Sequence, residues 1–223
     1  MTMIIAAHLK DHLLIAADRR AMSYDLVTGS LSFANDQQRK IQTWAGGVIA
    51  GTGEKVFLDR VTLALQQFNQ TITVSSLLKL VMQQLALRRL DGIPSASLAN
   101  NTIFITQYTG SDCLLYSIPI SALIDLDYSA NSMQDEHYIH ALSAYAMQVT
   151  CLHVPQDFTQ LQQFQANLKP IGDFDDINQA LDFYGAQLDL IFKLQAAHDS
   201  SVSPDFDLYL QNCHTGRVLC YEI

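Results

Sequence analysis

Three residues within the first forty positions could together perform nucleophilic chemistry: Thr2, Asp18 and Lys40. Thr2 becomes the N-terminal residue if Met1 is removed, and its small side chain permits that removal. A free N-terminal threonine carries its own base, because its α-amine, with a pKa near ~8, lies beside the hydroxyl. A lysine held charged by a carboxylate would complete such a site. These residue types therefore indicate a hydroxyl nucleophile at the N-terminus.

The segments around these residues predict that they converge. Apolar residues at 3–9 and 13–17 flank the polar turn 10–12, which is typical of a β-hairpin. Asp18 ends the second of these strands, and Lys40 precedes a third expected strand at 41–43. If the first three strands are neighbours in one sheet, the three side chains can meet at its edge.

Strand and helix signals come in blocks along the whole chain. The expected order is strands, two helices, strands, two helices and strands, with helices at 54–68, 75–90, 134–148 and 175–197. This order predicts an α+β fold, specifically a four-layer αββα sandwich of two antiparallel sheets covered by helices. A doubly wound parallel sheet would need strands and helices to alternate singly. No Gly/Ser/Pro-rich linker divides the chain, so residues 1–223 are expected to form one domain.

Composition excludes several classes of protein. Of 223 residues, 49% are hydrophobic and only 16% are charged, which excludes a disordered chain. A net charge of −9 argues against nucleic-acid binding. The chain has neither a signal peptide at its start nor an apolar run of the ~20 residues that cross a bilayer. The four cysteines form no CxxC pair, which indicates a reducing compartment. We therefore expect a cytoplasmic protein without membrane contact and without a cofactor.

The N-terminal third resembles the proteasome β-type peptidases, including the HslV-type bacterial ring peptidase. Thr2 and the run Lys10-Asp11-His12-Leu13-Leu14-Ile15-Ala16-Ala17-Asp18-Arg19-Arg20 are similar to the opening of that family of N-terminal nucleophile (Ntn) hydrolases. Arg39-Lys40-Ile41 and Ile49-Ala50-Gly51-Thr52 resemble two further family segments. The resemblance is good over residues 2–68 and coarse beyond them.

The resemblance implies a role for each matching residue. Thr2 would be the nucleophile and its α-amine the base, while Lys40, held by Asp18, would favour loss of the hydroxyl proton. The backbone N–H of Gly51 would stabilise the oxyanion. Ala21, Gln38, Gln42 and Ile49 would line the substrate pocket.

Two further positions implied by the resemblance lie outside that third of the chain. Asp199 matches an aspartate that helps position the terminal amine, although His198 replaces the family arginine and Val202 replaces the family serine. The family Gly-Ser-Gly turn has its best counterpart in 129–132, which supplies Ser132 but no glycine. Residues 150–173 are an expected insertion.

Other groupings of reactive side chains have simpler interpretations. His137 and His140 have helical spacing suited to a metal, but a solvated helix face explains them better, and no metal site is expected. Cys213-His214 suggests a cysteine nucleophile, yet no orienting acid is apparent, so a structural hairpin turn is favoured. The turn 51–55 contains glycines without the spacing of a phosphate loop.

The combined features predict a threonine endopeptidase-like hydrolase. Its substrates would be peptides or unfolded protein, cut within a homo-oligomeric ring that could work with an ATP-dependent unfoldase. Two alternatives remain open. One is a catalytically silent structural subunit on the same scaffold, which retention of Met1 would favour. The other is an amidase or ligase that uses Thr2 on one defined substrate.

Overall fold

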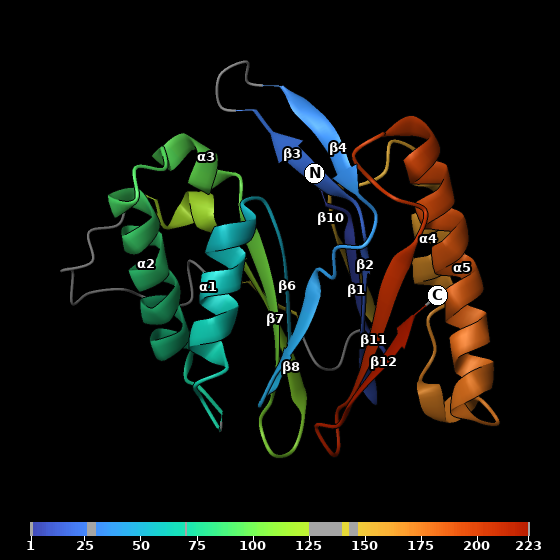
Figure 1. The fold of residues 1–223 in the computed structure, drawn as a ribbon. Coiled ribbons are helices and arrows are strands. Elements are labelled where there is room, and N and C mark those ends of the chain that lie inside the picture. Colours follow the sequence, from blue (N-terminus) through green and yellow to red (C-terminus); the bar gives the residue numbers. More distant parts are fainter. Residues whose placement is uncertain (1, 26–29, 70, 125–139, 143–146, 223) are drawn as a thin grey trace.

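The protein is an α+β structure built on two five-stranded antiparallel sheets (Figure 1). Our computed structural model describes residues 2–25, 30–69, 71–124, 140–142 and 147–222. The expected class, a mixed fold with antiparallel sheets, is confirmed.

The first sheet contains both ends of the described chain. Its strands run in the order β10-β1-β2-β11-β12, and every neighbouring pair is antiparallel. Four of them form the two hairpins that the sequence predicts. The strands are β1 (Ile4–His8), β2 (His12–Asp18), β10 (Gln148–Leu152), β11 (Phe206–Asn212) and β12 (Val218–Glu222).

The second sheet is formed by the middle of the chain. Its order is β5-β6-β7-β8-β9, again antiparallel throughout. The strands are β5 (Ile41–Trp44), β6 (Gly47–Thr52), β7 (Thr102–Tyr108), β8 (Cys113–Pro119) and β9 (His140–Leu142).

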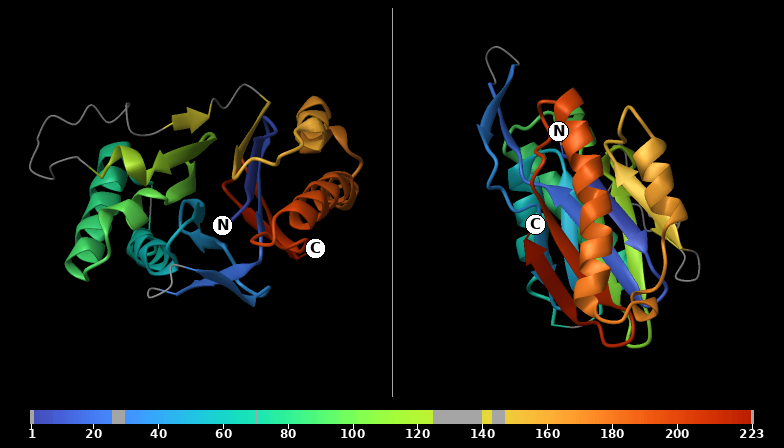
Figure 2. Two further views of the ribbon diagram at one scale, coloured as in Figure 1. Left: turned by 90° about the horizontal axis from the view of Figure 1, so that it is seen from above. Right: turned by 90° about the vertical axis from the view of Figure 1, so that its right-hand side faces the viewer.

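Helices cover the outward face of each sheet (Figures 1 and 2). Two helices lie along the second sheet, and a long helix with a short companion lies along the first. The described helices are α1 (Lys55–Leu65), α2 (Val74–Leu90), α3 (Ser95–Ala99), α4 (Thr159–Ala166) and α5 (Ile177–His198), with single 3-10 turns at Ile120–Ala122 and Ile171–Asp173. No helix in these ranges is long and apolar enough to cross a membrane.

Apolar side chains fill three separate layers of core. Phe57 of α1 belongs to the cluster between α1, α2 and the second sheet. Phe192 of α5 stacks on Phe206 of β11, with ring centroids 4.7 Å apart, in the cluster between the helices and the first sheet. Phe104 and Ile15 belong to the cluster between the two sheets. The two sheets are therefore each buried on both faces, which explains why β1 and β2 read as nearly continuous apolar runs.

Local sequence explains where the main helices begin. Thr73 accepts a hydrogen bond from the backbone N–H of Ser76, so α2 starts at Val74, one residue before the expected start at 75. Asp176 accepts from two backbone N–H groups at the start of α5. These caps satisfy donors that have no partner within the helix.

One expected segment is borne out and another is not. Residues 23–38, expected as a loop or a ragged hairpin, overlap the irregular two-stranded hairpin of β3 (Ala21–Tyr24) and β4 (Leu31–Asn35). Within 134–148, where a helix was expected, His140–Leu142 forms β9 instead, because it pairs with β8 at the edge of the second sheet. Sheet pairing here overrides a weak helical pattern.

Candidate active site

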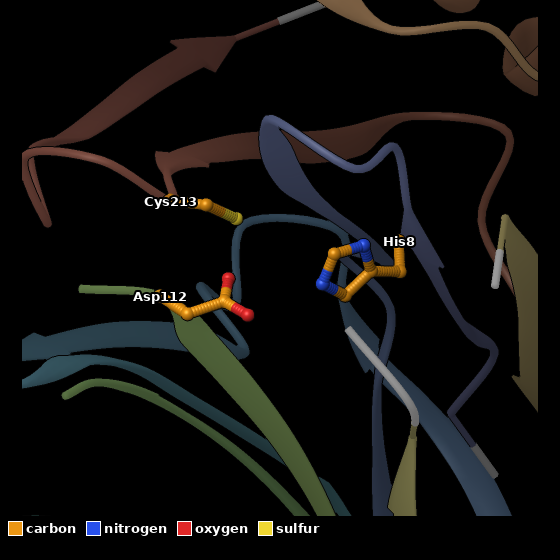
Figure 3. A group of neighbouring side chains, drawn as sticks. All are labelled: His8, Asp112 and Cys213. Atoms are coloured by element: carbon orange, nitrogen blue, oxygen red, sulfur yellow. The ribbon is translucent and has the colours of Figure 1, made fainter. Parts of the chain in front are cut away.

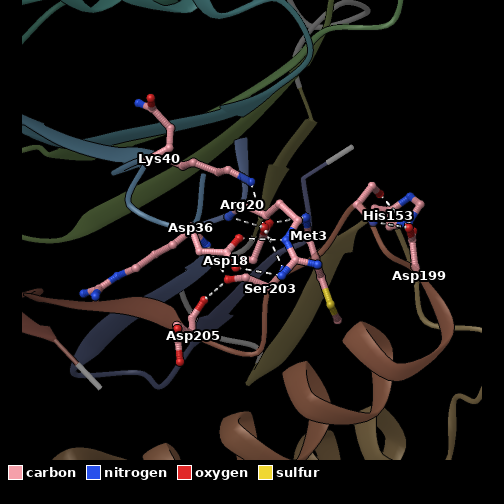
Figure 4. A network of polar contacts seen from close by, with 12 residues as sticks. Met3, Asp18, Arg20, Asp36, Lys40, His153, Asp199, Ser203 and Asp205 are labelled. Carbon is pink, nitrogen blue, oxygen red and sulfur yellow. Dashed lines mark hydrogen bonds and ion pairs between the residues drawn. The ribbon is translucent and has the colours of Figure 1, made fainter. Parts of the chain in front are cut away.

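A buried carboxylate, that of Asp18, organises the candidate site (Figure 4). Asp18 is fully buried at the end of β2. Its Oδ1 accepts the backbone N–H of Met3 at 2.8 Å, and its Oδ2 accepts from Lys40 Nζ at 2.8 Å. The backbone N–H groups of Arg20 and Ser203 also donate to Oδ2, at 3.0 and 3.3 Å. These four donors satisfy the buried carboxylate and fix its position.

The register of the first hairpin brings the N-terminal segment to this carboxylate. Ile4 pairs with Ala17 across β1 and β2, so the preceding residue, Met3, lies opposite Asp18. The backbone of Asp18 also donates to the carbonyl of Met3 at 3.2 Å. Thr2 is the next residue toward the N-terminus and is 9% exposed. The sheet itself therefore holds Thr2 within one residue of the Asp18 cluster.

Lys40 reaches the cluster from the other sheet. It directly precedes β5, in which Ile41 pairs with Ala50, and continuing that register places Lys40 opposite Gly51. The condition under which the three side chains were expected to meet, that the first three strands are neighbours in one sheet, is not fulfilled, because β5 belongs to the second sheet. Lys40 and Asp18 nevertheless meet, because the two sheets pack face to face.

Burial sets the electrostatics of Lys40. Its side chain is 8% exposed. Desolvation lowers the pKa of Lys40, and the neighbouring Asp18 opposes this only in part. An ammonium that releases its proton more readily than usual, held 2.8 Å from a fixed carboxylate, is suited to electrostatic control of a neighbouring proton transfer.

Gly51 lies in β6, under helix α1. A Cβ atom there would come within 2.5 Å of Leu58 Cδ2, the movable end of a side chain of α1, and 3.1 Å of the Thr102 carbonyl oxygen. A larger residue at this position would therefore require Leu58 to change its conformation.

The segment between β2 and β5 is fixed by arginine pairs. Arg20 Nε and Nη2 donate to the two carboxylate oxygens of Asp36, each at 2.7 Å, and its Nη1 donates to the Ser200 carbonyl at 3.0 Å. Arg19 forms an ion pair with Asp207 of β11. A bidentate arginine–carboxylate pair fixes the orientation of both side chains. Because Arg20 binds both Asp36 and Ser200, it fixes the position of the backbone before Lys40 with respect to residues 200–203.

Asp199 belongs to a second polar group beside the first. It accepts from the backbone and hydroxyl of Ser201, at 2.8 and 2.6 Å, and pairs with His153 Nε2 at 2.6 Å. Partial burial opposes ionisation of Asp199, but the bonds from Ser201 and His153 prevail and lower its pKa to about 2. His153 follows β10, whose Leu152 pairs with Ile4, so register places His153 opposite Met3 on the side away from Asp18.

The remaining predicted site residues are more dispersed. Ala21 begins β3 and Gln42 lies within β5, and both are half-buried. The backbone N–H of Gln38 donates to the Arg19 carbonyl at 3.0 Å. Ile49 is 2% exposed in the cluster beneath α1 and α2. Ser132 and His137 lie outside the described residues.

Sequence reasoning missed His153 and left the serines near Asp199 undecided. His153 follows a strand that begins before the expected 150–173 insertion, and nothing local marks that strand as a neighbour of β1. Val202 is fully buried, whereas Ser201 and Ser203 make the polar contacts on either side of it. Residues 199–203 form a turn in which Ser201 contacts Asp199 and Ser203 contacts Asp18, and no local sequence pattern marks this division.

We predict that Asp18→Asn destabilises the protein by about 3–5 kcal/mol, because it leaves the buried ammonium of Lys40 without a counter-charge. The free energy of unfolding from urea denaturation measures this. The double variant Asp18→Asn/Lys40→Met should recover part of the loss.

The matched control removes a surface ion pair. Asp59→Asn breaks the exposed Lys55–Asp59 pair on α1 and should change the free energy of unfolding by no more than about 1 kcal/mol. Equal stability of Asp18→Asn and the wild type would contradict the electrostatic role given to the Asp18–Lys40 pair.

A second prediction concerns acid stability. The folded-state pKa of Asp199 is depressed from 3.8 to about 2, so its contribution is fully present above pH 3.8 and is lost as the pH falls toward 2. Asp199→Asn should therefore reduce the loss of unfolding free energy between pH 4 and 2. Urea denaturation at stepped pH measures this slope, with Asp189→Asn in an exposed pair on α5 as control. An unchanged slope in Asp199→Asn would disprove the assignment.

Comparison with known proteins identifies similar folds only. No family model matches the chain, and no curated protein sequence matches it. Among solved structures, Anbu from Hyphomicrobium sp. strain MC1 is 15% identical with a TM-score of 0.58, covering 99% of this chain and 87% of that one. Anbu (ancestral beta-subunit) from Yersinia bercovieri is 12% identical with a TM-score of 0.62, covering 99% and 86%.

These similarities correct the family suggested by the N-terminal motifs. The identification as a proteasome β-type or HslV-type peptidase is wrong, since the similar structures are Anbu proteins, a proteasome-like family. The Anbu (Gly-1) mutant from Hyphomicrobium gives the same picture, at 16% identity and a TM-score of 0.58, covering 100% of this chain and 87% of that one. At these identities the chain shares the Anbu fold.

Proposed function

We propose that this protein is an N-terminal threonine hydrolase that cleaves amide bonds, with Thr2 as nucleophile after removal of Met1. In this proposal the two sheets and their covering helices form the four-layer αββα sandwich of an Ntn hydrolase. The similarity to proteins described as an ancestral beta-subunit supports a proteasome-like hydrolase.

One observation carries the proposal: the buried Lys40–Asp18 pair, 2.8 Å apart, lies one residue from Thr2. A buried ion pair is costly to maintain and is weak support for stability alone. A nucleophilic N-terminal hydroxyl, however, requires a positive charge nearby that favours loss of its proton. Lys40, beside the backbone segment that leads to Thr2, would supply that charge.

The proposed reaction proceeds in two stages. The α-amine of Thr2 accepts the hydroxyl proton while Oγ attacks the substrate carbonyl carbon, and the same proton passes to the leaving amine as the amide bond breaks. Water then attacks the carbonyl carbon of the resulting ester and gives a proton to the α-amine. The bond between that carbon and Oγ breaks, the α-amine passes the proton to Oγ, and the acid product leaves the free threonine. The charge of Lys40 favours the alkoxide character of Oγ during both attacks.

Two further groups complete the proposed site. The backbone N–H of Gly51, opposite Lys40 in register, would donate to the oxyanion. Asp199, fixed by Ser201 and His153, would orient the terminal amine. Ala21, Gln38 and Gln42 would contact substrate side chains, and Ile49 would support the pocket from the core.

The decisive experiment compares Thr2→Ala with the wild type on fluorogenic peptides and an unfolded protein substrate. Intact mass should first show that the native protein lacks Met1, because an acylated nitrogen cannot accept a proton. We expect Thr2→Ala to abolish turnover and Lys40→Ala to reduce it by at least about 100-fold. Thr71→Ala, an exposed threonine, is the matched control and should retain activity.

The outcomes separate the alternatives. Undiminished turnover by Thr2→Ala would exclude this mechanism. A protein that uniformly keeps Met1 and turns over no amide would instead be a structural subunit. Activity on one defined amide, with none on unfolded protein, would indicate an amidase.

We also propose that the protein forms homo-oligomers, in rings that enclose the site and could receive substrate from an unfoldase. The β3–β4 hairpin projects beyond the sheets (Figure 1), and it exposes Leu31 and Phe33, 54% and 60% accessible. Exposed apolar side chains on a projecting hairpin are typical of contact surfaces.

Sedimentation velocity at micromolar concentration measures this association. We expect species larger than the 24.9 kDa monomer, and Leu31→Ser/Phe33→Ser should shift them toward the monomer. The control Leu90→Ser changes an exposed leucine at the end of α2. A wild-type protein that sediments only as a monomer would contradict the proposal.

A further inference from the structure

Three turns meet at the end of the sheets opposite Thr2, and each contributes a potential metal ligand (Figure 3). His8 is the last residue of β1, so it lies at the other end of that strand from Thr2. Asp112 directly precedes β8, and Cys213 directly follows β11. The two sheets thus supply ligands to one point from three separate hairpins.

The three side chains form a compact and largely buried group. One ligand atom from each, an imidazole nitrogen, a carboxylate oxygen and the thiol sulfur, lie within 4.8 Å of one another. His8 is 0% exposed and Cys213 is 1% exposed, whereas Asp112 is partly buried. Burying polar atoms away from water costs free energy unless they form hydrogen bonds or bind a ligand.

The orientation of His8 points to a ligand. Its Nδ1 accepts the backbone N–H of Lys10 at 3.1 Å. Its Nε2 is buried and makes no hydrogen bond of normal geometry with a described residue, although the ring lies near the backbone of Cys113. Figure 3 shows this free edge of the ring turned toward the Asp112 carboxylate, with the Cys213 thiol beside the same carboxylate. A buried nitrogen of this kind is the exception in folded proteins and requires an explanation.

We propose that His8, Asp112 and Cys213 bind a divalent transition metal of the zinc class. Nitrogen, oxygen and thiolate sulfur together are the donor set that zinc accepts in tetrahedral sites. Calcium and magnesium would need oxygen ligands, and only one of the three residues supplies any. A thiolate, a carboxylate and a neutral imidazole also balance the two positive charges of the ion.

A water molecule would fill the fourth position. Cys113, which begins β8, lies beside the site: its backbone N–H donates to Asp112 Oδ1 at 2.7 Å, and its Sγ lies 3.6 Å from the carbonyl oxygen of Asn212. Its thiol is therefore adjacent to the segment that carries Cys213, but it does not belong to the group of ligand atoms that lie within 4.8 Å of one another.

Metal binding requires a defined exchange of protons. In the metal-free form Nδ1 accepts from Lys10, so the neutral imidazole carries its proton on Nε2. On binding, this proton would move to Nδ1 through solvent and the metal would take its place on Nε2, while the thiol of Cys213 would release its proton to solvent. The Lys10 N–H, which faces Nδ1 in the metal-free form, would then have to move away. Lys10 lies in the β1–β2 turn and has a φ of 70°.

Cobalt(II) titration of the metal-free full-length protein tests the site, because tetrahedral cobalt with a thiolate ligand has characteristic visible and charge-transfer absorption. We expect one cobalt ion per chain, displaced by zinc. Loss of an outer-shell partner usually costs about 10- to 100-fold in metal affinity, so Cys213→Ser and Asp112→Asn should each cost at least as much.

Cysteines elsewhere provide the matched controls. Cys151→Ser and Cys220→Ser leave the three ligands intact and should bind as the wild type does. Circular dichroism confirms that each variant is folded. Folded wild-type protein that binds neither ion at micromolar concentration would overturn the proposal, as would unchanged thiolate absorption in Cys213→Ser. The result is independent of the hydrolase proposal, because Thr2→Ala should bind metal normally.

Discussion

The contact between Asp18 and Lys40 is the constraint on which much of this structure depends. Asp18 ends a strand of the first sheet and Lys40 precedes a strand of the second, so their 2.8 Å ion pair joins the two halves of the molecule across the inter-sheet core. Both groups are largely withdrawn from water, and desolvating two charges is compensated only by good geometry and further hydrogen bonds. Three backbone N–H groups supply those bonds to the carboxylate. Each comes from a different segment, so the N-terminal strand, the β2–β3 connection and the 200–203 segment are all positioned by one side chain.

That arrangement places polar groups at both ends of β1. At its N-terminal end lie the Asp18 cluster and, on the opposite side of Met3, the His153–Asp199 pair. At its C-terminal end lies His8, with Asp112 and Cys213. The residues between them are wholly apolar and buried. The buried apolar residues of β1 thus separate the two polar groups. Substitutions in one group should therefore have effects that are independent of substitutions in the other.

Short motifs near the N-terminus suggested a proteasome β-type peptidase, whereas the similar solved structures are Anbu proteins. A threonine, an Ala-Ala-Asp strand end and a lysine before a strand specify local geometry, and several related proteins can share that geometry. The similarity to Anbu structures extends over nearly the whole chain, although the identity is 12–16%. Fold similarity at this level reports the layout of sheets and helices. Function has to be argued from the site.

The sequence alone determined the α+β class, the first hairpin and the long helix α5. These follow from periodicity, turn residues and strand ends, which are properties of neighbouring residues. The sequence also singled out Thr2, Asp18 and Lys40, but Lys40 meets Asp18 only because the two sheets pack face to face. Only the tertiary structure decided that β5 joins the second sheet, that β10 pairs with β1 and so brings His153 beside Met3, and that Cys213 lies beside His8 and Asp112. The last two of these bring together residues that lie roughly one hundred to two hundred positions apart in the sequence. Contacts between such distant residues depend on how whole sheets pack. The apolar pattern of a strand shows which of its faces is buried, but it does not identify the strand that pairs with it.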